Sequence, residues 1–244
     1  MYKEFANLYD QLMNDFDYKE WFLYIEEIFT KFKVSPEKVL EMACGTGNLT
    51  YYLGEKGYKL TAFDLSEEML AIAYKKLNKF KNIKLLKQDM TSFQLNEKYQ
   101  AVVSICDSIN YILCENQLLN TFKNVYKHLE TDGIFIFDIN SEYKLQEIIG
   151  ENIFVEDREN IFYIWDNDFE QDRKIHNFYL TFFYGADGIN FRRTDEYHRQ
   201  RSYKEEEVKD LLTSAGFNHV YSYEAFSFKP VAANSERINF VALK

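Results

Sequence analysis

The stretch that decides the fold is Val39-Leu40-Glu41-Met42-Ala43-Cys44-Gly45-Thr46-Gly47-Asn48. An apolar run ends in an acid, Glu41, and a loop of small residues then leads into a helical pattern. A second apolar run, residues 60–63, ends in a second acid, Asp64. This order predicts a strand, a loop, a helix and a second strand. Because open parallel sheets bind ligands at the carboxyl ends of their strands, both acids are expected to face a binding crevice.

The two acids suggest the chemistry of the ligand. Asp64 is placed to accept hydrogen bonds from a ribose diol. Glu41 is a poor neighbour for a pyrophosphate and a good one for a cation. S-adenosylmethionine (SAM) carries a ribose, a sulfonium and an ammonium. A dinucleotide site would instead need Gly-x-Gly-x-x-Gly, and its third glycine would fall at Thr50.

This motif resembles the first motif of the class I SAM-dependent methyltransferases, an acid followed by x-Gly-x-Gly-x-Gly. The residues that carry the resemblance are Glu41, Ala43, Gly45 and Gly47. Ala43 stands in place of the first glycine and adds only one methyl group where backbone must approach ligand. The resemblance covers residues 34–140 and 202–244 well and residues 151–201 poorly.

Apolar runs and helical patterns alternate along most of the chain, which predicts an α/β fold with a parallel sheet covered on both faces. The expected architecture is a doubly wound, seven-stranded, mostly parallel sheet, Rossmann-like as in methyltransferases. Strands are expected near 38–41, 58–63, 83–86, 99–106, 134–139, 219–226 and 238–243. Helices are expected at 19–32 and 48–56, after Ser66, around 118–129 and after Ser202.

Four local signals mark the helix ends. Ser66 is expected to cap one helix, and Ser202-x-x-Glu205 is interpreted as a capping box for the last helix, which Gly216 ends. The pair Asp132-Gly133 is expected to end the helix before the fifth strand.

The alternation breaks between residues 151 and 201, where aromatic residues alternate with polar ones. This pattern, with a hairpin turn at Asp187-Gly188, predicts an antiparallel insertion of about four strands. We therefore divide the chain into a SAM-binding core, 1–150 and 202–244, and a substrate-capping insertion, 151–201.

The resemblance also implies a set of cofactor-binding residues, all placed at the strand ends or in the N-terminal segment that covers them. These residues are Tyr9, Glu41, Ala43, Cys44, Gly45, Asp64, Leu65, Asp89, Met90, Cys106 and Asp107. Glu41 is implied to bind the ammonium of SAM directly or through water, and Asp64 the ribose hydroxyls.

Ala43, Cys44 and Gly45 are implied to pass beneath the cofactor. Leu65 would pack near the adenine, Asp89 would meet its amino group, and Met90 would lie against the ring. Cys106 and Asp107 would approach the methionine end. Tyr9-Asp10 matches a segment that lies over the cofactor in similar enzymes, although it could equally cover apolar surface alone.

His198 is the candidate catalytic residue. It lies in residues 195–203, a stretch similar to one found before the final helix of small-molecule methyltransferases. Strand alternation puts Glu196, His198 and Gln200 on one face. His198 could act as a base or bind the acceptor, or it could be a structural, hydrogen-bonded histidine.

Composition narrows the function classes. A net charge of −10 opposes nucleic-acid binding, which needs clustered Lys and Arg. The cysteines (Cys44, Cys106, Cys114) and the four histidines show no metal-ligand spacing, so neither a metal site nor a disulfide framework is expected. No segment resembles a signal peptide or a membrane span, so the expected compartment is the cytoplasm. Nothing indicates the oligomeric state.

The function we expect is transfer of a methyl group from SAM to N or O of a small-molecule acceptor, with S-adenosylhomocysteine as the product. A general base is needed only if the nucleophile must lose a proton. Two alternatives stay open. One is a non-catalytic SAM-binding protein, because methyl transfer requires no obligatory catalytic residue. The other is a nucleotide-dependent oxidoreductase, which Thr50 and Glu41 disfavour.

Overall fold

The computed structural model describes residues 3–13, 16–158, 160–185 and 190–244. Seven strands form the core sheet in the order β10-β11-β5-β4-β1-β2-β3. Their bounds are β1 Lys38–Met42, β2 Lys59–Asp64, β3 Ile83–Lys87, β4 Tyr99–Ser104, β5 Leu129–Asn140, β10 His219–Glu224 and β11 Arg237–Leu243. Strands β1 to β5 pair in parallel, and β11 is antiparallel to both of its neighbours. The predicted doubly wound, mostly parallel sheet is confirmed.

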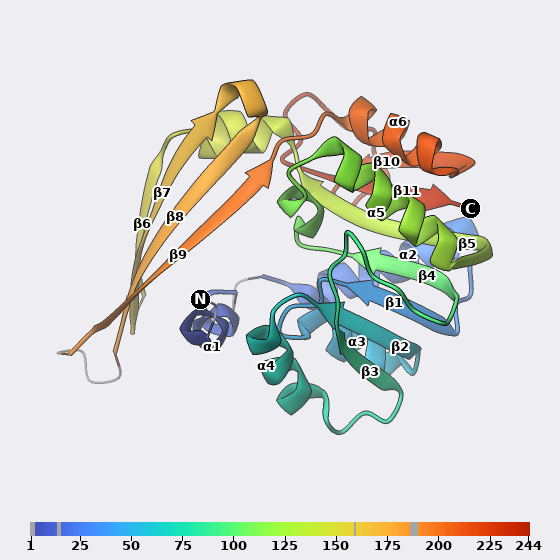
Figure 1. Cartoon of the computed structure of the whole chain (residues 1–244), viewed down its shortest axis with the longest axis horizontal. Coiled ribbons are helices and arrows are strands. Elements are labelled where there is room, and N and C mark those ends of the chain that lie inside the picture. Colours follow the sequence, from blue (N-terminus) through green and yellow to red (C-terminus); the bar gives the residue numbers. More distant parts are fainter. Residues whose placement is uncertain (1–2, 14–15, 159, 186–189) are drawn as a thin grey trace.

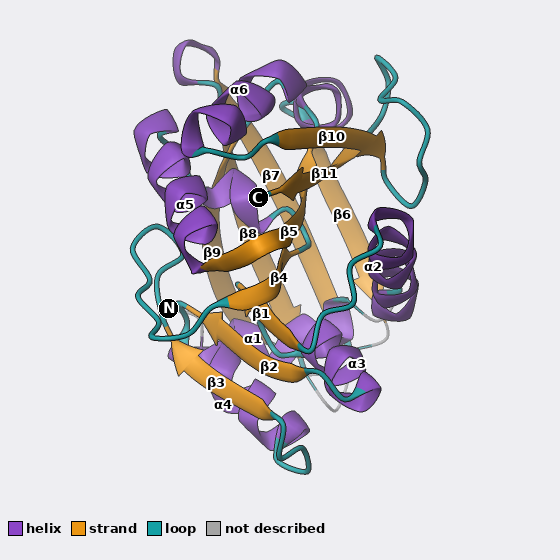
Figure 2. Cartoon of the chain, turned by 90° about the vertical axis from the view of Figure 1, so that its right-hand side faces the viewer, coloured by secondary structure: helices purple, strands orange, loops and turns teal. Residues whose placement is uncertain are grey.

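Helices cover both faces of this sheet (Figure 2). On one face, α2 (Tyr18–Phe32) and α3 (Asn48–Lys56) pack against apolar side chains of the central strands, including Val39 and Val103. On the other face, α5 (Glu115–His128) and α6 (Glu205–Ala215) pack against the opposite side chains, including Leu40 and Val102. Because successive side chains of a strand point to opposite faces and both faces are covered, the central strands are largely apolar on both sides.

The loop between β1 and α3 depends on Gly47, the residue before α3. Its φ is +80°, a left-handed conformation that favours glycine. A Cβ at this position would come within 2.8 Å of Leu77 Cδ1 on α4 (Glu67–Leu77). Both the backbone conformation and the close packing of α4 therefore favour glycine at position 47. As predicted, Ser66 caps α4 by accepting a hydrogen bond from the Met69 N–H.

The second sheet contains four antiparallel strands in chain order, β6 Ile153–Arg158, β7 Ile161–Glu170, β8 Ile175–Tyr184 and β9 Arg192–Arg201. These strands confirm the predicted antiparallel insertion. They extend past the carboxyl ends of the core strands, and α1 (Lys3–Leu12) lies between them and α4 (Figure 1). The predicted turn residues Asp187-Gly188 lie outside the described residues. Short helical segments η1 (Ser108–Tyr111), η2 (Lys144–Ile149) and η3 (Gln171–Arg173) complete the fold.

Two of the predicted helix boundaries are wrong. Ser202 does not cap α6, because its buried hydroxyl hydrogen-bonds His176 Nε2 at 3.0 Å, and the residue before the helix is Lys204. Asp132-Gly133 does not end α5, which stops at His128. The pair lies inside β5, where Asp132 has a φ of +60°. Ser202 therefore makes a tertiary contact and Asp132 lies at an irregularity of a strand, so neither residue marks a helix end.

Candidate functional site

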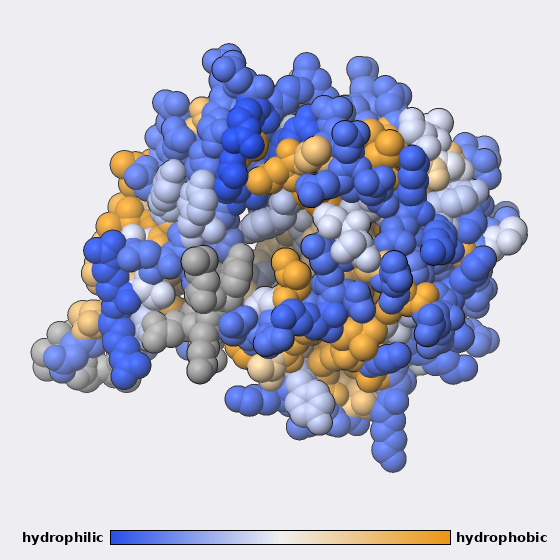
Figure 3. Space-filling model, in the orientation of Figure 1, coloured by the Kyte–Doolittle hydropathy of each residue, from blue (hydrophilic) through white to orange (hydrophobic). Residues whose placement is uncertain are grey.

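The site is a cavity of about 810 Å³ at the carboxyl ends of β1, β2 and β4, closed on one side by the second sheet. A hollow near the middle of the face in Figure 3 lies between that sheet and the core. The strand order reverses between β1 and β4, and open α/β sheets bind ligands at such a reversal. Every predicted site residue lines this cavity: Tyr9, Glu41, Ala43, Cys44, Gly45, Asp64, Leu65, Asp89, Met90, Cys106, Asp107 and His198.

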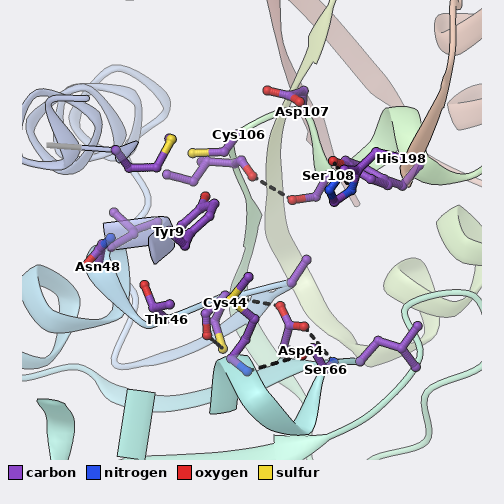
Figure 4. Close-up of a pocket in the computed structure, with 18 of the residues that line it drawn as sticks. Tyr9, Cys44, Thr46, Asn48, Asp64, Ser66, Cys106, Asp107, Ser108 and His198 are labelled. Atoms are coloured by element: carbon purple, nitrogen blue, oxygen red, sulfur yellow. Dashed lines mark hydrogen bonds between the residues drawn. The ribbon is translucent and has the colours of Figure 1, made fainter. Parts of the chain in front are cut away.

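Figure 4 shows how the cavity is arranged, with Asp64 and Ser66 at one end and Asp107 and His198 at the other. The Asp64 carboxylate accepts the Gly45 N–H at 2.8 Å and the Ser66 N–H at 2.9 Å, one on each oxygen. Burial raises its pKa, whereas these backbone donors oppose the shift. Because an ionised carboxylate has about four lone-pair sites, two remain for a ligand hydroxyl pair.

Several residues at this edge of the sheet have left-handed backbone conformations. Ala43 has a φ of +53° and Gly45 one of +55°, while Cys106 and Asp107 after β4 have values of +61° and +52°. The left-handed value at Ala43 accounts for the glycine that the methyltransferase motif has there. A Cβ built on Gly45 would meet no atom within 4 Å, so the loop presents bare backbone to the cavity.

Glu41 is the most unusual side chain of the cavity. It is only 2% exposed, and its Oε2 has no hydrogen-bond partner among the described residues. Burial raises its pKa to about 8, and the charge of Asp64 adds to the shift. A buried carboxylate without a partner is costly, and a cation bound beside it would offset that cost. The ammonium of SAM fits this position.

Asp107 is held by Arg237, which the sequence did not mark, and by Gln200, which strand alternation had placed on the same face as His198. Its carboxylate accepts from Arg237 Nη2 on β11 at 2.8 Å and from Gln200 Nε2 on β9 at 2.7 Å. Burial opposes the ionisation of Asp107, but Arg237, the Gln200 hydrogen bond and the charge of Lys144 together outweigh it and lower the pKa. Arg237 also binds the buried Asp138 at the end of β5. This network links the second sheet to three core strands, and no local sequence pattern predicts it.

Tyr9 reaches the cavity from α1, which Asp10 fixes in place. The Asp10 carboxylate accepts from Thr46 Oγ1 at 2.5 Å and Asn48 Nδ2 at 3.1 Å, and it pairs with Lys76 at 2.8 Å. The Tyr9 hydroxyl lies 3.3 Å from that of Tyr18. Helix α1 therefore contacts the glycine loop directly, rather than covering apolar surface alone.

The remaining predicted residues flank this centre. Asp89 accepts from the N–H and hydroxyl of Thr91, at 2.8 and 2.7 Å, so its position after β3 is fixed. Leu65 is 63% exposed at the rim, which suits a residue that packs on a ligand. The thiols of Cys44 and Cys106 have pKa values raised by burial, so both are protonated at neutral pH.

His198 lies on the wall formed by the second sheet. Its Nδ1 is 3.4 Å from the Tyr111 hydroxyl, and burial lowers its pKa, so the ring is neutral at pH 7. Glu196, His198 and Gln200, which strand alternation placed on one face, are all buried. Around His198 the wall is aromatic, with four rings from β7 and β8 that line the cavity: Tyr163, Trp165, Phe178 and Phe182.

The described part of the chain offers neither a metal-binding cluster nor a membrane-spanning helix. It contains no group of three or more His, Cys, Asp or Glu side chains that could hold a metal ion. None of its helices is long and apolar enough to cross a bilayer.

Comparisons with known proteins agree with this geometry. Residues 39–133 match the family model described as a methyltransferase domain. A putative methyltransferase of Bacillus subtilis is 36% identical over the whole of this chain and 97% of its own length. The crystal structure of a SAM-dependent methyltransferase from Clostridium acetobutylicum superposes with a TM-score of 0.90, at 38% identity, over 99% of this chain and 98% of that one.

A more distant relative acts on a named substrate. The dTDP-3-amino-3,4,6-trideoxy-α-D-glucopyranose N,N-dimethyltransferase of Streptomyces venezuelae is 34% identical over 41% of each chain. The glycine loop, the two strand-end acids and these full-length similarities together show that the chain belongs to the class I SAM-dependent methyltransferases.

Proposed function

We propose that the chain transfers a methyl group from SAM to a nitrogen or oxygen of a small molecule bound between the core and the second sheet. The observation that carries the proposal is that the strand-end acids and the aromatic wall line one continuous cavity. Its volume of about 810 Å³ lies in the upper part of the range for small-molecule sites. The amino-sugar substrate of the Streptomyces venezuelae relative supports a small polar acceptor.

Bound SAM supplies a methyl group on a positive sulfur, which makes that carbon electrophilic. In our proposal, Glu41 holds the ammonium, Asp64 the ribose hydroxyls, and Asp89, Leu65 and Met90 the adenine. Ala43, Cys44 and Gly45 would pass beneath the cofactor, Tyr9 would cover it, and Cys106 and Asp107 would hold its methionine end. Fixing both reactants in line contributes about 7–11 kcal/mol to such reactions.

His198 is proposed to take the proton that the acceptor loses. Its lowered pKa keeps the imidazole neutral, the state that accepts a proton, and its position on the second sheet faces the cavity. The Tyr111 hydroxyl near Nδ1 is placed to orient the ring. A neutral amine acceptor needs this base only after methyl transfer, whereas a hydroxyl acceptor needs it during the transfer.

The experiment combines the purified protein with SAM and a small-molecule extract of cells, and measures S-adenosylhomocysteine with a mass gain of one methyl group in one extract component. Asp64→Asn should weaken cofactor binding, since about 1.5–3 kcal/mol is expected for each charge-assisted hydrogen bond lost. The surface variant Asp132→Asn should match the wild type. A protein that binds SAM but forms no product above the extract-free blank would favour the non-catalytic alternative.

A further inference from the structure

One cation of the cavity wall has no carboxylate partner. Lys144 is the first residue of η2 and lines the cavity. Within the described residues, its Nζ makes no hydrogen bond and lies within 4 Å of no carboxylate. The other two cations of the wall are paired, Lys87 with Glu67 at 2.7 Å and Arg237 with Asp107 at 2.8 Å.

Three acids attract the charge of Lys144: Asp107, Glu236 and Asp138. Asp107 and Asp138 both bind the Arg237 guanidinium. Glu236 is exposed on the loop before β11. Burial, together with the neighbouring charge of Arg237, lowers the pKa of Lys144, which means that its charged form is incompletely compensated. A bound anion would supply the missing compensation through a charge-assisted hydrogen bond.

The position of Lys144 favours the acceptor side of the cavity. Leu145 and Ile149, on the same short helix, form a buried cluster with Phe178, against which Trp165 packs. Trp165 and Phe178 belong to the aromatic wall of the second sheet, whereas Asp64 and the glycine loop lie on the core side. An acceptor resting on this wall would bring one of its ends to η2.

We propose that Lys144 binds an anionic group of the methyl acceptor, a carboxylate or a phosphate. The proposal rests on the proposed function, since it assigns the acceptor to this cavity. The acceptor is then a small amine or alcohol with an acidic group remote from the atom that is methylated. The competing occupant of Lys144 is the carboxylate of SAM itself, which the experiment below separates from an acceptor group.

The test measures how fast Lys144 reacts with formaldehyde and borohydride in the wild-type protein, with peptide mass spectrometry as the readout. The protein is saturated with S-adenosylhomocysteine, and inorganic phosphate or acetate is added against sodium chloride at equal ionic strength. An anion that binds Lys144 should slow the reaction of this lysine about threefold when the anion is present at about twice its dissociation constant. Lys84, an exposed lysine on β3, is the internal control and should not change.

The outcomes separate the possible sources of the anion. Protection by phosphate alone indicates a phosphate acceptor, and protection by acetate indicates a carboxylate. Unchanged Lys144 reactivity with both anions overturns the proposal, as does full protection by S-adenosylhomocysteine alone. This readout does not require turnover, so failure of methyl transfer in the extract assay would count against the proposed function and not against the anion site.

Variants give a second, independent measurement by calorimetry. Lys144→Met keeps the apolar stem and removes the charge, whereas Lys144→Arg keeps the charge. Affinity for S-adenosylhomocysteine should stay within about twofold in both, because in this proposal Lys144 binds the acceptor and not the cofactor. Phosphate or acetate binding to the loaded protein should be lost in Lys144→Met and retained in Lys144→Arg and in Lys84→Met. A loss of cofactor affinity in folded Lys144→Met would assign the lysine to the cofactor instead.

Discussion

At the scale of single residues, the cavity is distinguished by titratable side chains buried away from water. Glu41 keeps one oxygen without a partner in the described structure, and burial raises its pKa to about 8. Between the pKa of an unfolded glutamate, about 4.3, and 8, the folded state holds more protons than the unfolded state. The contribution of Glu41 to stability is therefore greatest below pH 4 and declines as the pH rises towards 8.

Glu41 also makes cofactor binding depend on pH. A bound cation favours the ionised carboxylate, so SAM should bind more tightly as pH rises from 6.5 to 8, by up to about tenfold per unit, and level off above 8. Glu41→Gln should remove this component. Calorimetric titration of the wild type and of Glu41→Gln across this pH range isolates the contribution of Glu41, because the ionisation of SAM itself affects both proteins equally. Parallel pH profiles for the two proteins would show that Glu41 does not meet the ammonium.

The residues that the sequence predicted and those that it missed differ in how they are positioned. Glu41 and Asp64 follow apolar runs directly, so a local pattern places them at strand ends, and both line the cavity. Arg237 reaches Asp107 across 130 residues of chain, and Lys144 enters through a short helix with no sequence signature. Their positions depend on how β5 and β11 pair, which residue spacing does not encode.

At the scale of elements, α6 illustrates how tertiary contacts override a local motif. The sequence Ser202-x-x-Glu205 has the form of a capping box, yet the Ser202 hydroxyl hydrogen-bonds buried His176. The residue that occupies the N-cap is Lys204, with extended backbone (φ −74°, ψ 149°) and no side-chain hydrogen bond to the helix. The first turn of α6 is therefore left without the side-chain cap that the sequence predicted.

Lys204→Ser should stabilise the protein by about 1 kcal/mol, because a serine hydroxyl can accept an N–H of the first turn. Ser202→Ala should instead destabilise it by about 1–3 kcal/mol, since His176 loses its partner in a buried place. Urea denaturation measures both, with Lys204→Ala as the control for loss of the charge. If Lys204→Ser matched Lys204→Ala, the N-cap would lie elsewhere.

Helix α1 gives a prediction about cofactor exchange. Its attachment to the core depends on Asp10, whose carboxylate meets Thr46, Asn48 and Lys76. Asp10→Asn should weaken this attachment and increase the dissociation rate of S-adenosylhomocysteine, measured by stopped-flow fluorescence. Because the contact is partly exposed, added salt should raise the wild-type rate as well. Gln11→Ala, an exposed change on the same helix, should leave the rate unchanged.

At the scale of the whole molecule, two sheets share one cavity but derive from different parts of the chain. The alternating core was predictable, because strand and helix periods differ and buried parallel strands are continuously apolar. The antiparallel strands of residues 151–201 were also predictable from alternation. The sequence did not predict that the aromatic face of the second sheet covers the strand ends, because this placement depends on contacts between distant residues, such as Gln200 with Asp107.

We expect the second sheet to select the acceptor and the core to bind the cofactor, and a substitution of Trp165 can test this expectation. Trp165 lines the cavity, and Phe154 on β6 packs on the same ring, at 5.3 Å between centroids, without lining it. Trp165→Leu should lower turnover of the extracted acceptor about tenfold or more, because pocket contacts of this kind are worth about 1–3 kcal/mol. Affinity for S-adenosylhomocysteine should stay within about twofold, since the second sheet contributes neither of the acids proposed to hold the cofactor. Phe154→Leu should leave both quantities near wild type. If folded Trp165→Leu lost its affinity for the cofactor, the second sheet would belong to the cofactor site, and acceptor selection would have to lie elsewhere on the wall.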